Sequence, residues 1–178
     1  MGPCLHDGRY ELRQARNQAQ IAAAQALRYR AFMEEGGALA DEAGRSLRLD
    51  IDRFDAHCDH LIVIDHAASG QDRGGVVGTY RLLGQDAAHS AGGFYSALEF
   101  DLACLLGSQG RLLELGRSCV APEHRGGHLL QLLRNVAEPG ERLARRGALP
   151  PSAPSVALWA GRKAQGLPGP ATAPSAVC

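Results

Sequence analysis

Lysine is almost absent from this chain of 178 residues. Of its 19 basic residues only Lys163 is a lysine, which together with the abundant alanine and glycine indicates a GC-rich coding bias rather than a chemical role. The chain also has no excess of charge of either sign, and its formal net charge is +0. A protein that binds nucleic acid through bulk charge needs a basic surface, so we expect no nucleic-acid partner.

Paired metal-binding and disulfide motifs are also missing. The cysteines are odd in number and none forms a CxxC pair, which argues against a disulfide framework or a zinc site. The histidines show no HxxxH or HExxH spacing, so no metal site is predicted. The five cysteines are Cys4, Cys58, Cys104, Cys119 and Cys178.

Long hydrophobic runs are the third absence. The first residues, MGPCLHDGRYELRQ, hold no apolar core of a secretory signal, and the longest apolar runs are far too short to cross a bilayer. We therefore expect a cytoplasmic protein, and the sequence leaves open a loose peripheral attachment to the inner membrane.

The chain does contain short apolar runs alternating with amphipathic segments. A first helix is predicted to begin at Asn17, with Gln20 in capping-box position, and to end at Gly36. The predicted strands span 10–15, 60–65, 75–83 and 111–120; further helices span 96–106 and 127–137; loops span 38–57 and 84–93. This order predicts one α/β sandwich on a mostly antiparallel sheet, not a repeating βαβ fold.

The most informative stretch is Arg111–Leu133, RLLELGRSCVAPEHRGGHLLQLL. It reads as a strand, a basic glycine-rich turn and a helix, an arrangement that presents backbone N–H groups to a phosphate. Glu114 and Arg117 lie on the strand that leads into the turn. The combination indicates an enzyme that holds a phosphate-bearing acyl carrier and acts on an amine.

The composition changes from about Pro139 onward, where seven of the nine prolines lie. We divide the chain into a domain over 8–138 and a tail over 139–178. The tail is expected to be mostly disordered, because little of it is apolar enough to build a core. Its one strand-like run is Val156–Trp159.

Several ordered segments resemble the ornithine lipid acyltransferases, bacterial enzymes of the GNAT-like superfamily. These segments are LRYRAF, DRFDAHCDHLIVID, VVGTYRLL, GGFYSALEFDL and GRLLELGRSCVAPEHR, between residues 10 and 138. The resemblance implies a GNAT-like sandwich. It also implies transfer of a 3-hydroxyacyl group from acyl carrier protein to the α-amino group of ornithine, giving a lyso-ornithine lipid.

A more distant resemblance is to the acyl-homoserine-lactone synthases, which use the same donor. Their functional pattern falls on Arg28 and Phe32, on a D-x-x-D pair at Asp52 and Asp55, on Arg81, and on an E-x-x-R pair at Glu114 and Arg117. The tryptophan that those synthases carry soon after the phenylalanine has no counterpart among residues 33–39. This departure weakens the interpretation as a lactone synthase.

The resemblance implies that Glu114 and Arg117 are catalytic. Glu114 is the candidate base, acting directly or through a water, and a carboxylate on a mostly apolar strand is expected to have a raised pKa. The alternative is a structural ion pair between Glu114 and Arg117 or Arg81. Cys119 is more simply a packed apolar residue than a nucleophile.

Four residues are candidates for substrate binding. Asp52 and Asp55 could hold the cationic end of ornithine, or could belong to a solvated acidic loop. Arg81, on a strand that reads as buried, could bind the substrate carboxylate or pair with Glu114. Arg28 could reach the substrate or the pantetheine arm, or lie on the surface.

The turn at Arg125, Gly126, Gly127 and His128 is the expected contact for the 4′-phosphopantetheine arm of acyl carrier protein, and no permanently bound cofactor is expected. GNAT enzymes that use coenzyme A carry R-x-x-G-x-G, but His128 and Leu130 stand at the two glycine positions. A carrier-protein donor has a single phosphate, so a turn that presents fewer backbone N–H groups suffices to bind it.

The resemblance to these enzymes stops near Glu138, although a GNAT fold has a further strand after the helix. We therefore expect a fold that is truncated or read out of frame at its C-terminus, with an unpaired sheet edge. Two alternatives stay open: a GNAT enzyme using free acyl-CoA on another amine, and a non-catalytic domain that binds acyl carrier protein or a membrane.

Overall fold

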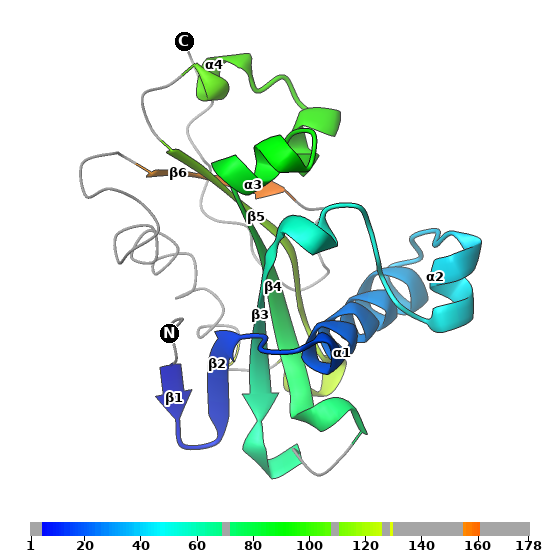
Figure 1. Ribbon diagram of the computed structural model, residues 1–178. Helices are drawn as coiled ribbons and strands as arrows, with labels where there is room; N and C mark the ends of the chain where they lie inside the picture. Colours follow the sequence, from blue (N-terminus) through cyan, green and yellow to red (C-terminus); the bar gives the residue numbers. More distant parts are fainter. Residues whose placement is uncertain (1–4, 69–71, 108–110, 126–128, 130–154, 161–178) are drawn as a thin grey trace.

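The computed structural model describes residues 5–68, 72–107, 111–125, 129 and 155–160, and these residues form a single six-stranded sheet with the strand order β1-β2-β3-β4-β5-β6 (Figure 1). The strands are β1 (Leu5–Asp7), β2 (Tyr10–Gln14), β3 (Asp59–Asp65), β4 (Val76–Gly84), β5 (Arg111–Val120) and β6 (Ser155–Ala160). Neighbouring strands from β1 to β5 are antiparallel, and β6 runs parallel to β5. The expected mostly antiparallel α/β fold is confirmed.

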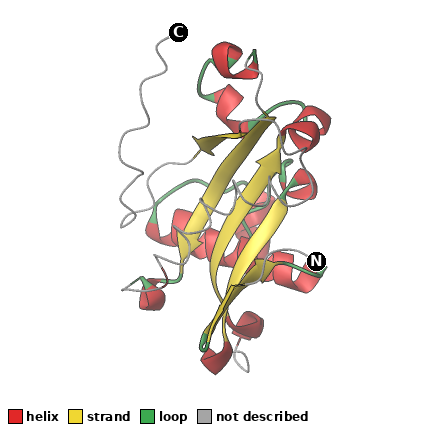
Figure 2. Ribbon diagram, turned by 90° about the vertical axis from the view of Figure 1, so that its left-hand side faces the viewer, coloured by secondary structure: helices red, strands yellow, loops and turns green. Residues whose placement is uncertain are grey.

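Helices lie beside the sheet and at one end of it (Figures 1 and 2). They are α1 (Gln18–Tyr29), α2 (Glu42–Leu47), α3 (Gln85–Ser90) and α4 (Ala103–Leu106). Short 3-10 turns include η2 (Asp55–His57), η5 (Tyr95–Leu98) and η6 (Pro122–His124). Among the described residues, no helix has the length and apolar character needed to span a membrane.

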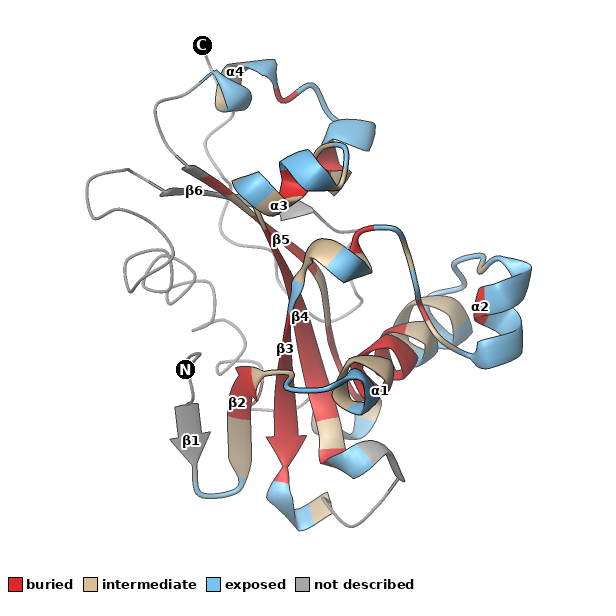
Figure 3. Cartoon of the chain, viewed as in Figure 1, coloured by how far each residue is buried: buried red, intermediate tan, exposed pale blue. Residues whose placement is uncertain are grey.

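The central strands are buried over almost their whole length (Figure 3). In β3 every residue after Asp59 is buried, and β4 is buried from Val77 to Leu83. Such continuous burial explains why these runs show no alternation of apolar and polar residues in the sequence. One core cluster joins Leu27 of α1 to the sheet, and a second gathers around Phe54, Leu83 and Leu112.

Helix α1 forms as the sequence predicts. The side chain of Asn17 accepts a hydrogen bond from Gln20 N at 3.0 Å, and Gln20 Oε1 accepts one from Arg16 N at 2.8 Å. The chain continues into a π-helical turn over Arg30–Glu35 and ends at Gly36, followed by Gly37 with φ of +69°. Glycine tolerates this left-handed conformation, so the predicted end of the helix is confirmed.

Two expected loops contain short helices. The segment 38–57 holds α2, where Asp41 accepts a hydrogen bond from Gly44 N at 2.7 Å, and the segment 84–93 holds α3. The helix expected over 96–106 is instead two separate turns, η5 and α4. Helices of four to six residues span fewer than two turns, so they leave no readable hydrophobic period.

The end of the sheet differs from the expectation. Residues 155–160 form β6 and pair with β5 from Arg111↔Ser155 to Gly116↔Ala160, so β5 is not an unpaired edge. The run Val156–Trp159 had the composition of a strand, but its parallel partner lies about 45 residues earlier, and this is a pairing that local pattern does not reveal. The helix expected over 127–137 and the rest of the tail lie outside the described residues, apart from Leu129.

Candidate active site

Six charged side chains form a closed ring of ion pairs beside β4 and β5. Each of three aspartates from the segment after α2 contacts two of three arginines, which come from α1, β4 and β5. Around the ring the order is Arg28, Asp50, Arg117, Asp52, Arg81 and Asp55, returning to Arg28. The ring holds equal numbers of positive and negative charges, which is what makes burial of so many ions tolerable.

Arg28 is the most deeply buried member, with no solvent-exposed surface. Its Nε donates to Asp50 Oδ2 at 2.8 Å, and one terminal nitrogen donates to both oxygens of Asp55 at 2.8 and 2.9 Å and to the carbonyl oxygen of Asp50. Burial by itself raises the pKa of Asp55, but the guanidinium groups of Arg28 and Arg81 outweigh it and hold the pKa below its usual value. Arg28 is therefore a buried structural cation and not a surface residue.

Arg81 is also buried and is paired with two aspartates. One terminal nitrogen donates to Asp52 Oδ1 at 2.7 Å and to Asp55 Oδ1 at 3.1 Å. Burial lowers the pKa of Arg81, but Asp52 more than compensates and the net shift is upward. Among the described residues Arg81 pairs with aspartates and not with Glu114, so the alternative pairing is not formed.

Arg117 occupies a bulge in β5. Thr79 is opposite Cys119 and Arg81 is opposite Gly116, so Tyr80 alone faces both Arg117 and Ser118. Arg117 adopts φ of +52°, an uncommon conformation for a residue with a Cβ atom. Bulges re-aim side chains beside functional sites, and here the bulge brings the Arg117 guanidinium 5.1 Å from the Tyr95 ring centre and 5.8 Å from that of Phe32.

Within the described part of the chain, Glu114 is held by hydrogen bonds and makes no ion pair. Its Oε1 accepts from Ser96 N at 2.7 Å and from the Ser96 hydroxyl at 2.5 Å, and its Oε2 accepts from Tyr95 N at 2.9 Å. These donors lie at the beginning of η5, where backbone N–H groups have no partner within the turn. The carboxylate therefore fixes η5 against the centre of β5 while it remains almost fully buried.

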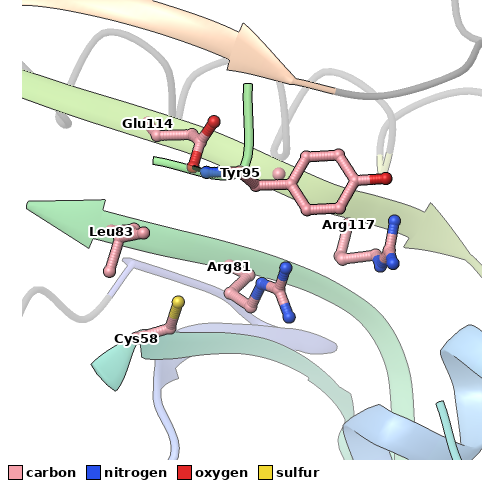
Figure 4. A pocket seen from close by; sticks show the side chains of 7 residues that line it. Cys58, Arg81, Leu83, Tyr95, Glu114 and Arg117 are labelled. Carbon is pink, nitrogen blue, oxygen red and sulfur yellow. Dashed lines mark hydrogen bonds between the residues drawn. The ribbon is translucent and has the colours of Figure 1, made fainter. Parts of the chain in front are cut away.

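Glu114, Arg81 and Arg117 line one small pocket between β4, β5 and η5 (Figure 4). The empty space here is about 260 Å³ when the part open to solvent is included, and the lining is completed by Cys58, Leu83, Tyr95 and Gly116. Burial raises the pKa of the Cys58 thiol to about 12, which keeps this sulfur protonated at neutral pH. The predicted catalytic pair and Arg81 are thus brought together, whereas Asp52, Asp55 and Arg28 belong to the ring but do not line this pocket.

The donor-binding turn is described only as far as Arg125. Arg125 Nε donates to Val120 O at 3.0 Å and a terminal nitrogen donates to Glu35 Oε2 at 2.5 Å, so its charge is paired with an acid of the π-helical turn. Gly126, Gly127 and His128 lie outside the described residues. Their role with the phosphopantetheine arm stays a prediction.

Three residues of this site were not predicted from the sequence. Asp50 links Arg28 to Arg117 but lies outside the D-x-x-D spacing, and its only signal is its place two residues before Asp52. Tyr95 and Ser96 act through backbone N–H groups, which carry no residue signature. Cys119 is buried in the core and burial raises its pKa to about 12, which fits the packing role.

Comparisons with known proteins place these features in a family. The family profile described as "Acetyltransferase (GNAT) domain" matches residues 27–135. The L-ornithine N(alpha)-acyltransferase of Rhizobium meliloti is 54% identical over 126 residues, which are 69% of this chain and 42% of that protein. Its counterpart from Agrobacterium fabrum is 50% identical over 129 residues, which are 71% of this chain and 44% of that protein.

A solved structure shares the fold. FeeM, an N-acyl amino acid synthase from uncultured soil microbes, superposes with a TM-score of 0.50 at 16% identity over 76% of this chain and 67% of that chain. This chain spans less than half the length of the two curated relatives described above. The matched segment contains the whole ion-pair ring and Glu114, and the chain belongs to the GNAT acetyltransferase family.

Proposed function

We propose that this chain is an N-acyltransferase that moves a 3-hydroxyacyl group from acyl carrier protein to the α-amino group of ornithine, giving a lyso-ornithine lipid. The observation that carries the proposal is the pocket that both the carboxylate of Glu114 and the guanidinium of Arg117 line. The acceptor is taken from the curated relatives, which are 47% to 54% identical and named L-ornithine N(alpha)-acyltransferase.

The pocket suits direct transfer to an amine. The amine nitrogen attacks the thioester carbonyl carbon, the new C–N bond forms, the C–S bond breaks, and the thiolate leaves on the pantetheine arm. The proton that the amine loses passes to Glu114, directly or through a water, and finally to the thiolate. Glu114 Oε2 accepts only one hydrogen bond from the described residues, so it keeps a lone pair for this proton.

The proposed donor is an acyl group on the phosphopantetheine arm of acyl carrier protein. Residues 125–128 are the proposed contact for its phosphate, and the strands that would flank the arm are β5 and β6, the parallel pair at the end of the sheet. Because the product carries an acyl chain, peripheral contact with the inner membrane is also part of the proposal. A cytoplasmic location likewise remains part of the proposal.

The test is a turnover assay with purified protein, 3-hydroxyacyl carrier protein and ornithine, in which the lyso-lipid is followed by mass spectrometry. We expect product from the wild type and at least a 100-fold lower rate from Glu114→Gln, because general-base groups contribute about 10²- to 10⁴-fold. Glu42→Gln, at an exposed position in α2, is the matched control and is expected to retain the full rate.

Two replacements in the assay separate the alternatives. Free 3-hydroxyacyl-CoA in place of the carrier protein tests the donor, and lysine or glutamine in place of ornithine tests the acceptor. Turnover with acyl-CoA but not with acyl carrier protein would overturn the proposed donor. Folded protein that binds acyl carrier protein without any turnover would support the non-catalytic alternative.

A further inference from the structure

The Arg117 side chain makes no hydrogen bond with the other described residues, whereas Arg28 leaves only its second terminal nitrogen without a partner. Its Nε lies 3.2 Å from Asp50 Oδ2 and a terminal nitrogen lies 3.5 Å from Asp52 Oδ2, but neither contact has hydrogen-bond geometry among the described residues. Arg28 and Arg81, by contrast, donate at 2.7–3.1 Å to their aspartates. A guanidinium has five N–H donors, so Arg117 has donors to offer to a ligand.

Arg117 is also the arginine of the ring that is most open to solvent. Its side chain is 25% exposed, whereas those of Arg28 and Arg81 are 0% and 5% exposed. The side chain lies beside the Tyr95 ring at the pocket (Figure 4). The bulge in β5 and the rings of Tyr95 and Phe32 hold the guanidinium in place, so binding a ligand there costs little side-chain entropy.

The negative charge of Glu114 lies in the same pocket as the positive charge of Arg117. Glu114 is three residues before Arg117 on β5, and both line the pocket between η5 and the sheet. The ring itself is neutral by count, so Glu114 leaves the site with a net negative charge. A phosphate would add negative charge next to Glu114, Asp50 and Asp52, whereas a zwitterion brings one charge of each sign.

We propose that Arg117 binds the α-carboxylate of the amino-acid acceptor and thereby makes the site selective for α-amino acids over simple amines. This inference rests on the proposed function and names the part of the substrate that the site recognises. In an α-amino acid the ammonium and carboxylate groups are separated by one carbon atom. The carboxylate can therefore meet the Arg117 fork while the ammonium group reaches Glu114 in the same small pocket. A planar guanidinium matches a carboxylate with two parallel hydrogen bonds.

The three arginines of the ring therefore have different roles. Arg28 and Arg81 are engaged by aspartates and keep the loop of Asp50, Asp52 and Asp55 in place. Arg117 shares Asp50 and Asp52 only through its two loose contacts, so a substrate carboxylate does not have to break a hydrogen bond to bind. The side chain of ornithine beyond its α-carbon is left to other residues.

The experiment compares L-ornithine with L-ornithinamide, in which an uncharged amide replaces the α-carboxylate. Equilibrium binding to the full chain is measured by calorimetry, and acylation is measured in parallel. The variants are Arg117→Gln, which keeps a Cβ at the positive φ, and Arg117→Lys, which keeps the charge but not the fork. Arg16→Gln, at an exposed position before α1, is the control. Thermal melting shows that each variant is folded.

We expect the wild type and Arg16→Gln to bind ornithine roughly 10- to 100-fold more tightly than ornithinamide, as a charged hydrogen-bonded pair provides. Arg117→Gln should lose this preference and Arg117→Lys should retain part of it. An unchanged preference in folded Arg117→Gln would overturn the inference. So would wild-type protein that does not distinguish the two ligands. Carboxylate-dependent binding without turnover would sustain the inference and count against the proposed function alone.

Discussion

At the scale of single residues, the site depends on buried charges that are compensated in pairs. Arg28 has no exposed surface, yet its charge is met by Asp50 and Asp55 at hydrogen-bond distance. A buried ion pair adds little net stability over an apolar pair, but removing one partner leaves an uncompensated charge. The ring is therefore sensitive to any change that alters the count of charges.

Asp55→Asn tests this sensitivity. The change leaves Arg28 and Arg81 short of one negative charge, and we expect the free energy of unfolding to fall by about 3 kcal/mol. Urea unfolding followed by circular dichroism measures it. The control is Asp59→Asn, which removes an exposed charge that accepts a hydrogen bond from Gln14 and should cost less than about 1 kcal/mol. Equal losses in the two variants would contradict the account of the ring.

The buried thiols of Cys58 and Cys119 give a second prediction at this scale. Burial raises the pKa of Cys58 and of Cys119 to about 12, and only the thiolate reacts readily with alkylating reagents. We expect iodoacetamide at pH 7.5 to leave both unmodified in the folded protein and to label both in urea, as read by peptide mass spectrometry. Rapid labelling of folded Cys119 would reopen its interpretation as a nucleophile.

At the scale of elements, helix α1 presents Arg28 to the ring, so the start of this helix matters for the site. Asn17→Ala removes the hydrogen bond to Gln20 N and should lower the free energy of unfolding by about 1 kcal/mol. Asn17→Asp keeps the acceptor and should lose much less. Chemical unfolding of the two variants side by side measures the difference, and equal losses would show that the cap adds nothing to stability.

The strands were predictable from the sequence because their signals are local. β5 has the predicted bounds, since ten residues from Arg111 read as one apolar run that ends before Pro122. β6 was not predictable as part of the sheet, because its partner is distant along the chain. The short helices α2 and α3 went unrecognised because six residues are too few to show a period.

The site was predictable in its residues but not in its pairings. The structure brings six candidate residues to one region: Arg28, Asp52, Asp55, Arg81, Glu114 and Arg117. The contacts of Glu114 with η5 could not be foreseen, because backbone N–H donors are the same in every residue. The positive φ of Arg117 was equally invisible, since the bulge depends on how β4 and β5 align.

At the scale of the whole molecule, the ring ties α1, the loop of the aspartates, β4 and β5 into one electrostatic unit. His60 at the start of β3 supports this unit, because its Nε2 lies 3.0 Å from Asp55 O. In its neutral form the imidazole donates that hydrogen bond, and a protonated ring would lie against Arg28 and Arg81. Burial lowers the pKa of His60 below its usual value, so the folded chain favours the neutral ring.

Stability should therefore fall as the pH drops below about 6.5, the usual value for histidine. In that range His60 is protonated in the unfolded chain but stays neutral in the folded chain, so the free energy of unfolding decreases with falling pH. The lowered pKa of Asp55 acts in the same direction below about pH 4. Urea unfolding at pH 7.5, 6.0 and 5.0 measures the dependence. His60→Gln keeps a donor for the Asp55 carbonyl without titrating, and should flatten the curve between pH 7.5 and 5.0. The exposed His89→Gln should leave it unchanged, and a wild-type curve that is already flat in this range would show that His60 is not held neutral by the fold.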